Sequence, residues 1–427
     1  MIAKDYPQLF ETCYTQTLPN GLTIRAIHKP EFKRIYAFLA VNYGSVDMEF
    51  SFEGQIHKTP AGVAHYLEHK MFDLPEGNAM QMFTALGGNP NAFTSYSMTA
   101  YYVRADRRYE ENLRLLLRMV LTPCFTPESV DKERGIIAQE IKMYEDAPDT
   151  QLYETLYAEA YVHHPLRVPI AGSVESIGQI TAETLELCHR AFYQPANMVL
   201  CVEGDLDPAV VEAIAREMTP TFRAPMAEKL PPLPEPAIVP AHDCLRYMDV
   251  SMPTFTLAFL LPDTSPGDDR REIAADLAAE LLCGEASPLY RRLYEQGLID
   301  SGFSGGYECT RGKAMLVFSG DSRDPDAVCA HILNEASRLR SEGFDPSDLR
   351  RLKRSALGRR LRDLDSFSAT CYRICADYFD QVDYLNFPAA FDAVTEELTA
   401  DCLTWVTPVR AVRVVIAPKQ EAISCSS

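Results

Sequence analysis

Residues 61–72 read AGVAHYLEHKMF and carry two histidines four positions apart, with a glutamate directly before the second. After Gly62 the stretch contains good helix formers and no further Pro or Gly, which predicts a helix. Positions i and i+4 lie on one helix face, so His65 and His69 can present two imidazoles to one point, with the Glu68 carboxylate beside them. A hydrolytic zinc site needs nitrogen ligands, a base and at least one more protein ligand. The stretch therefore predicts most of a metal site and lacks one ligand.

A chance pattern on a half-exposed helix is the alternative explanation of this stretch. From average composition, H-x-x-E-H should arise by accident in roughly one chain in a hundred of this length. A further ligand elsewhere in the chain would favour the metal.

Residues 126–146, TPESVDKERGIIAQEIKMYED, supply a candidate for that ligand. Thr126 is a typical N-cap and Pro127 suits the first helical position, so the segment predicts a helix. We expect its apolar face to comprise Ile136, Ile137, Ile141 and Tyr144. Glu133 and Glu140 lie two turns apart beside that face, where a carboxylate needs a cation or another partner. Either Glu140 completes a metal site and Glu133 supports it, or both lie on a solvated edge.

These stretches resemble the insulinase/pitrilysin family of inverted-motif zinc metallopeptidases, which includes the mitochondrial processing peptidase. The resemblance is dense over about residues 20–205, and HYLEHKMF with AFTSYSMTAYY is similar to its short YmfH-like bacterial branch. The matching stretches are His65–His69, Asn91–Thr94 and Glu133–Glu140, and more loosely His164, Pro165 and Gly172.

The resemblance implies a role for each matching residue and one zinc ion per chain. It implies that His65, His69 and Glu140 are zinc ligands. It further implies that Glu68 is the general base and that Glu133 is a supporting acid. An extended substrate would pair with a strand formed by Asn91, Ala92, Phe93 and Thr94.

The composition excludes some other classes of protein. The chain has 427 residues and a formal net charge of −19, with no basic cluster that would favour nucleic acid. The N-terminus lacks the apolar region of a signal peptide, and no run approaches ~18 apolar residues, so we expect a cytoplasmic protein without a membrane span. The twelve cysteines then read as reduced thiols. Cys371 and Cys375, four apart on a predicted helix, are a less favoured second metal site.

A Pro-rich stretch at residues 222–240 divides the chain into a predicted zinc-bearing domain, 1–221, and a second domain, 241–427. Strands and helices mix in both without strict alternation, which predicts an α+β fold with largely antiparallel sheets and helices packed on them. Expected strands include Leu22–His28, Tyr36–Tyr43, Ala92–Arg104, Met198–Gly204, Thr254–Leu261, Ala314–Gly320 and Ala411–Ala417.

The two domains are predicted to be homologous. Phe344–Leu349 repeats Phe125–Val130 in pattern, and in that register Glu133 falls on Leu352 and Glu140 on Arg359. The second-half helix that should match the motif helix, Ile273–Gly284, contains no histidine. We therefore expect a clamshell of two related domains, of which only the first binds metal.

One departure from the family concerns substrate binding. Second halves in this family often carry an Arg and a Tyr that bind the substrate carbonyl, and here those positions read Pro288 and Asp300. Such a donor is worth about 3 kcal/mol in the transition state. We therefore expect a zinc endopeptidase for extended peptides that dimerises, with itself or with a related zinc-free subunit that supplies the donors. The alternative is a weakly active peptide-binding or assembly subunit.

Overall fold

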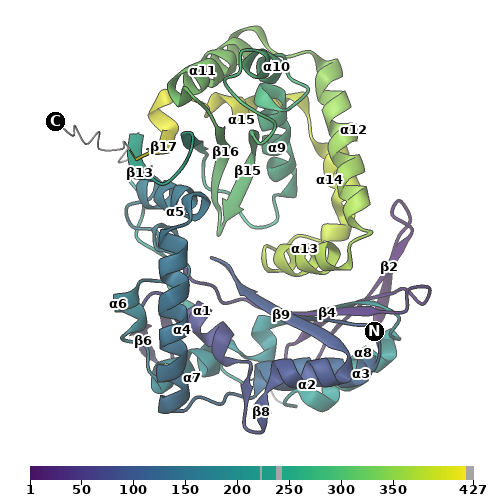
Figure 1. The fold of residues 1–427 in the computed structure, drawn as a ribbon. Coiled ribbons are helices and arrows are strands. Elements are labelled where there is room, and N and C mark those ends of the chain that lie inside the picture. The colour runs from purple at the N-terminus through teal and green to yellow at the C-terminus, as the bar shows by residue number, and fades with distance from the viewer. Residues whose placement is uncertain (222–223, 237–242, 420–427) are drawn as a thin grey trace, which may run out of the picture. The chain divides into compact units, whose positions relative to one another are not determined.

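The computed structural model describes residues 1–221, 224–236 and 243–419. Contacts divide the chain into two compact units, each assembled from separate segments (Figure 1). Unit 1 comprises Met1–Ile141, Val168–Pro232 and Arg359–Pro388, and unit 2 comprises the remainder. The division at residues 222–240 predicted from the sequence stays a prediction, and residues 222–223 and 237–240 of it lie outside the described residues.

Unit 1 is built on a seven-stranded sheet with the order β1-β2-β3-β11-β4-β10-β9. All pairs are antiparallel except β3 with β11. The strands are β1 (Ile2–Tyr6), β2 (Glu11–Thr17), β3 (Thr23–His28), β4 (Ile35–Val41), β9 (Gly88–Thr94), β10 (Thr99–Ala105) and β11 (Met198–Gly204). The central strands β4 and β11 are buried along their whole length, which places the core at the middle of the sheet.

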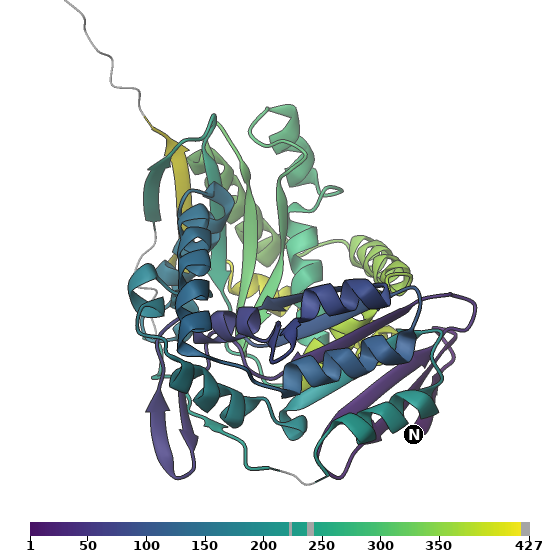
Figure 2. The same cartoon turned by 60° about the horizontal axis from the view of Figure 1, so that its bottom comes forward.

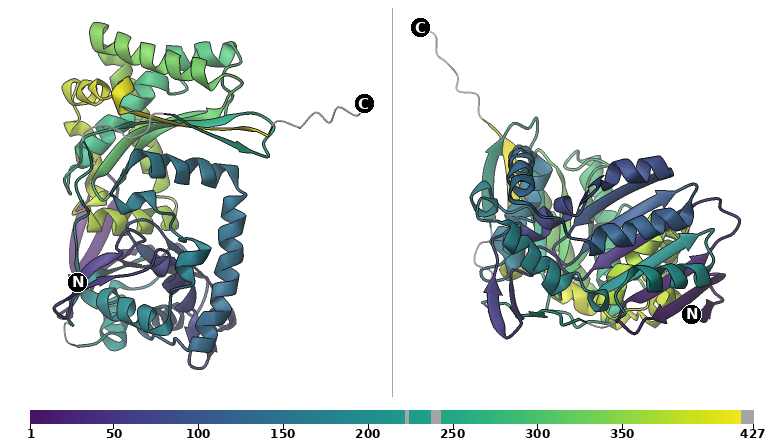
Figure 3. Two further views of the ribbon diagram at one scale, coloured as in Figure 1. Left: turned by 90° about the vertical axis from the view of Figure 1, so that its left-hand side faces the viewer. Right: turned by 90° about the horizontal axis from the view of Figure 1, so that it is seen from below.

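Smaller strands and a set of helices complete unit 1. The short strands are β5 (Glu49–Phe52), β6 (Gln55–Lys58), β7 (Asp73–Leu74), β8 (Gly77–Asn78) and β12 (Glu228–Lys229). The helices are α1 (Val63–Lys70), α2 (Ala79–Leu86), α3 (Tyr109–Leu121), α4 (Pro127–Glu145), α6 (Val174–Ile177), α7 (Ala182–Phe192), α8 (Pro208–Met218) and α13 (Phe367–Phe379), of which α4 ends in unit 2. One face of the large sheet carries α13, and α2 and α3 lie across the opposite face (Figures 1, 2 and 3).

Unit 2 contains a five-stranded sheet with the order β13-β17-β14-β16-β15. Its strands are β13 (Asp243–Met248), β14 (Thr254–Leu260), β15 (Ser304–Thr310), β16 (Lys313–Asp321) and β17 (Ala411–Pro418). Its helices are α5 (Pro148–Ala160), α9 (Asp269–Cys283), α10 (Pro288–Glu295), α11 (Pro325–Glu342), α12 (Pro346–Asp363, which ends in unit 1), α14 (Phe387–Ala393) and α15 (Glu396–Thr404). The helix α5 packs on β17 and β14 of this sheet.

The two sheets share one topology, as expected for a duplication. In both, a parallel pair is followed by three antiparallel strands, so that β3, β11, β4, β10 and β9 correspond to β13, β17, β14, β16 and β15. The repeat is also visible in α4 and α12, which begin at Pro127 and Pro346 in the same sequence register. The predicted α+β class with largely antiparallel sheets is confirmed.

One predicted strand was wrong. The segment Ala92–Arg104 is a hairpin of β9 and β10, because Ser95 turns the chain between them. The Ser95 hydroxyl oxygen accepts hydrogen bonds from the backbone N–H groups of Ser97 and Met98, at 3.3 and 3.1 Å. Within the described residues, every helix is too short or too polar to cross a membrane.

Candidate metal centre

Two glycines fix the position of α1. Gly62 has a φ of 92°, and a Cβ there would lie 2.5 Å from the carbonyl oxygen of Ala171. Gly172 has a φ of 73°, and its Cβ would lie 2.6 Å from the carbonyl oxygen of Ala61. Only glycine fits two backbones that cross this closely with positive φ angles. The crossing sets the first turn of the helix that carries both histidines.

The neighbouring helix α4 is attached to α1 near its start. The Tyr66 hydroxyl donates to the carbonyl oxygen of Val130, and the buried Lys70 ammonium donates to that of Ser129 at 3.3 Å. Thr126 caps α4, as predicted, because its hydroxyl oxygen accepts from the Ser129 N–H at 3.2 Å. These contacts fix the rotation of α4 against α1.

His65, His69 and Glu140 converge as a result. Their potential ligand atoms all lie within 4.8 Å of one another. The Nε2 atom of His65 lies 3.6 Å from Oε1 of Glu140, and that of His69 lies 3.4 Å from Oε2. The two imidazole rings are 4.7 Å apart, as expected for an i, i+4 pair.

The geometry of this group fits a zinc ion. Tetrahedral zinc with ligand bonds near 2.1 Å holds neighbouring donor atoms about 3.4 Å apart. The two Nε2–carboxylate separations match that spacing and are longer than ordinary hydrogen bonds. Two imidazole nitrogens and one carboxylate also leave a coordination position open, as in catalytic zinc sites. The three residues can therefore hold the metal.

Glu133 lies behind His69. Its Oε1 atom is 2.9 Å from Nδ1 of His69, on the ring edge away from Glu140. This hydrogen bond with His69 holds the pKa of the Glu133 carboxyl below its usual range. Burial lowers the pKa of His69, but the Glu133 hydrogen bond and the surrounding carboxylates outweigh it and raise that pKa. Such a carboxylate fixes the tautomer of a ligand histidine.

Glu68 is buried beside the same group. Burial raises the pKa of its carboxyl, and a hydrogen bond from the Thr94 hydroxyl to Oε2, at 2.7 Å, opposes that rise. The charges of His65 and His69 lower this pKa, and that of Glu140 raises it. A carboxylate of raised pKa is suited to accept and release a proton near neutral pH.

The structure thus brings together most of the residues singled out in the sequence. Asn91–Thr94 form the second half of β9, at the edge of the sheet, and Thr94 contacts Glu68. That contact was not predicted, because no local pattern shows where β9 meets α1. The predicted apolar face of α4 was wrong at Ile136, which is 48% exposed, whereas Ile137 and Ile141 are buried and Tyr144 is half-buried.

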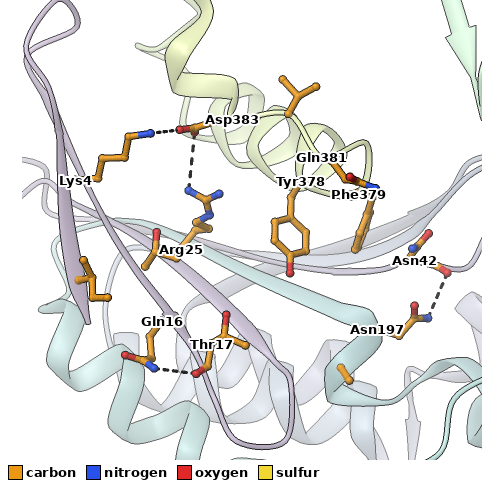
Figure 4. Close-up of a pocket in the computed structure, with 14 residues that line it drawn as sticks. Lys4, Gln16, Thr17, Arg25, Asn42, Asn197, Tyr378, Phe379, Gln381 and Asp383 are labelled. Carbon is orange, nitrogen blue, oxygen red and sulfur yellow. Dashed lines mark hydrogen bonds and ion pairs between the residues drawn. The ribbon is translucent and has the colours of Figure 1, made fainter. Parts of the chain in front are cut away.

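Other candidate sites have weaker geometry. Among the described residues, His65, His69 and Glu140 form the one group of three side chains close enough to share a metal ion. Cys371 and Cys375 do not belong to such a group. A cavity of about 900 Å³ lies elsewhere in unit 1, where Lys4, Arg25 and Asp383 gather below the end of α13 (Figure 4). It contains none of the predicted site residues.

Comparison with known proteins identifies the family. Residues 52–174 match the model for insulinase (peptidase family M16), and residues 179–356 match the model for the peptidase M16 inactive domain. The chain is 33% identical over 410 residues to the uncharacterized zinc protease YmfH of Bacillus subtilis, and the match covers 93% of both chains. The chain belongs to the insulinase family, M16.

Other M16 relatives support this assignment. A second zinc protease of Bacillus subtilis, YmxG, is 31% identical over 207 residues, which is 47% of this chain and 48% of that one. The crystal structure of a putative M16-like peptidase from Alicyclobacillus acidocaldarius superposes with a TM-score of 0.92 and 30% identity, covering 96% of this chain and 99% of that one. The M16 inactive-domain match covers most of the second half, which lacks the histidine motif.

Proposed function

We propose that this M16 chain is a zinc-dependent endopeptidase that cleaves extended peptides or unfolded segments. The convergence of His65, His69 and Glu140 on one point, with Glu68 buried beside them, is the observation that carries the proposal. A structural zinc site would have four protein ligands, whereas this group offers three and places a base next to the open position.

The catalytic cycle depends on Glu68. A zinc ion held by the two histidines and Glu140 would supply a Lewis acid and lower the pKa of water toward neutrality. Glu68 takes the proton from the attacking water and returns it to the leaving amine. Glu133 keeps Nδ1 of His69 protonated, so that Nε2 presents a lone pair.

The substrate binds along β9. This strand is an edge of the large sheet, and Asn91–Thr94 carry backbone groups that an extended peptide can pair with. Backbone pairing selects unfolded segments and depends weakly on side chains. The scissile bond then lies close to Thr94, whose hydroxyl contacts Glu68.

Metal depletion and replacement test the proposal. Purified protein should contain about one zinc per chain and hydrolyse an unfolded peptide, lose both after chelation and regain both with zinc. His65→Ala and Glu140→Ala should lose both irrecoverably, whereas Glu128→Ala, an exposed position on α4, should lose neither. Hydrolysis that survives in His65→Ala would contradict the metal assignment.

We further propose that a related zinc-free subunit supplies the missing substrate-binding donors. Pro288 is the first residue of α10, and the carboxylate of Asp300 accepts the N–H of Gly302 at 2.8 Å, so both have local structural roles. The product of a neighbouring gene should therefore raise the hydrolysis rate, and an unrelated protein should not. Equal rates with both would count against the partner.

The second candidate function is a peptide-binding or assembly subunit with little turnover. The absence of an Arg and a Tyr at positions 288 and 300 favours it. Zinc bound without hydrolysis, alone or with the partner, would support this candidate. The cytoplasmic location expected from the sequence stays a prediction.

A further inference from the structure

The Phe93 ring of β9 contacts three other aromatic rings on the face of the unit 1 sheet that carries α13. We call this group the aromatic shelf; it consists of Phe38 of β4, Phe93 of β9, Tyr102 of β10 and Tyr372 of α13. The Phe93 ring lies 5.9 Å from that of Tyr372 and 6.4 Å from that of Tyr102. Tyr102 in turn stacks on Phe38 at 5.8 Å.

The shelf is only partly covered. Phe38 is buried at 1% exposure, Phe93 and Tyr102 are half-buried, and Tyr372 is 40% exposed. Phe38 thus belongs to the core. The outer rings continue from Phe38 to β9, which is an edge strand of the sheet. Half-exposed aromatic rings that continue a buried cluster can accept a further apolar side chain.

Adjacent residues of β9 connect the shelf with the candidate metal centre. Side chains alternate between the two faces of a strand. Thr94 points to the α1 face, where its hydroxyl meets Glu68, and Phe93 points to the α13 face, where its ring meets Tyr372. The candidate metal centre and the aromatic shelf therefore lie on opposite faces of the sheet, beside neighbouring residues of the edge strand β9.

A peptide paired with β9 would follow the same alternation. If one of its side chains lies on the α1 face beside Thr94, its two neighbours lie on the α13 face. The β9 side chains on that face are Asn89, Asn91 and Phe93, since Asn91 is opposite Tyr102 and Phe93 is opposite Ala100 in the ladder with β10. Because the Tyr372 ring lies 5.9 Å from that of Phe93, a substrate side chain placed next to Phe93 would lie near Tyr372.

We propose that the aromatic shelf is a substrate subsite that binds the side chain next to Phe93 in a peptide paired with β9 and selects an aromatic or large aliphatic residue there. The subsite rests on the proposed pairing of substrate with β9. It adds a side-chain preference to a binding mode that otherwise uses the peptide backbone. Tyr372 and Phe93 are its specificity-determining residues.

Peptide binding to an inactivated chain tests the subsite without turnover. The probes are two fluorescent ten-residue peptides of Ser and Thr, identical except for one central Phe in place of Ser, and binding is followed by anisotropy. The Glu68→Gln chain should bind the Phe peptide about three- to tenfold more tightly, the size of one aromatic contact. In the Glu68→Gln chain, a further Tyr372→Ala change should bring the ratio of the two affinities close to one, and Tyr372→Phe should leave that ratio unchanged.

A matched control separates the subsite from a general loss of aromatic surface. Tyr247 of β13, in unit 2, is 54% exposed, and Tyr247→Ala should leave the ratio unchanged. A ratio near one in Glu68→Gln, or a ratio that survives Tyr372→Ala, would overturn the proposal. Hydrolysis by the chain with Glu68 intact is measured separately; its failure would count against the proposed function and would not alter the binding comparison.

Discussion

The hydroxyl of Thr94 donates a hydrogen bond of 2.7 Å to Oε2 of Glu68. Thr94 is the last residue of β9, and Glu68 lies in α1, 26 positions earlier. The bond joins the strand proposed to bind substrate to the carboxylate proposed to move protons. Because Glu68 is buried, one fixed donor restricts its rotamer and opposes the effect of burial on its pKa. Thr94 is therefore a positioning residue for the base.

Replacing Thr94 by Val should slow catalysis without removing the metal. Val has the same shape and lacks the donor, so Glu68 loses its orientation at a cost of about 1–1.5 kcal/mol, or about tenfold in kcat. KM should change little, because the backbone of β9 is intact. The measurement is steady-state kinetics together with zinc content.

Thr94→Ser provides the control for this prediction. It keeps the hydroxyl and removes only a methyl group, so kcat should return close to the original value. A Thr94→Val chain with unchanged kcat would show that the hydrogen bond does not position the base.

Replacing Glu133 by Ala should weaken zinc binding about 10- to 100-fold. The side chain holds Nδ1 of His69 at 2.9 Å and so fixes the ring that presents Nε2 to the metal. Competition with a chelator of known affinity measures the effect. Glu128→Ala, on the exposed first turn of the same helix, is the matched control, and equal affinities in the two variants would contradict the supporting role.

Gly172→Ala should destabilise unit 1 by more than about 2 kcal/mol. Its φ of 73° and the 2.6 Å approach to the Ala61 carbonyl leave no room for a Cβ. Because that crossing sets the start of α1, zinc affinity should fall as well. Urea unfolding and zinc titration measure both effects.

Gly135→Ala is the control for this prediction. Gly135 lies in α4 with open space around its Cα, so Ala should stabilise the helix by up to about 1 kcal/mol. Unchanged stability in Gly172→Ala, or an equal loss of stability in both variants, would contradict the assignment of the crossing.

His189 should make the protein sensitive to acid. Burial lowers its pKa to about 4, and its Nε2 atom lies 3.0 Å from the carbonyl oxygen of Val120. The unfolded chain binds the proton at the ordinary pKa near 6.5, so the stability from neutral His189 is complete above that pH and is lost as the pH falls toward 4. By pH 4.5 the loss should be about 2.5 kcal/mol.

The His189→Gln variant isolates this contribution from that of the carboxylates. Its unfolding free energy should fall less steeply than that of the original chain between pH 6.5 and 4.5, as measured by urea unfolding at a series of pH values. Parallel pH profiles for the two chains would show that His189 is not the group responsible.

Local patterns in the sequence predicted the elements of the candidate site well. The i, i+4 spacing correctly predicted that His65 and His69 share one helix face. The similar sequences that begin the helices at Pro127 and Pro346 indicated the duplication, which the shared topology of the two sheets supports. The hairpin at Ser95 was missed because its turn uses a serine side chain in place of Gly or Pro.

Long-range packing could not be predicted in the same way. The helix α13 follows the Pro-rich stretch in sequence yet packs on the unit 1 sheet, and α5 precedes it yet packs on the unit 2 sheet. The apolar periodicity of a helix predicts which of its faces is buried but not which sheet that face packs against. The aromatic shelf depends on the packing of α13 against the unit 1 sheet, because α13 carries Tyr372 to the ring of Phe93.

The most direct test of the account compares the wild-type chain with Glu68→Gln for zinc content and peptide hydrolysis, with and without the partner subunit. The account predicts about one zinc per chain in both and hydrolysis only with Glu68. Hydrolysis by Glu68→Gln at the wild-type rate would contradict the assignment of Glu68 as the base. If both chains bind zinc and neither hydrolyses peptide, the proposal that the protein is a peptidase would be contradicted.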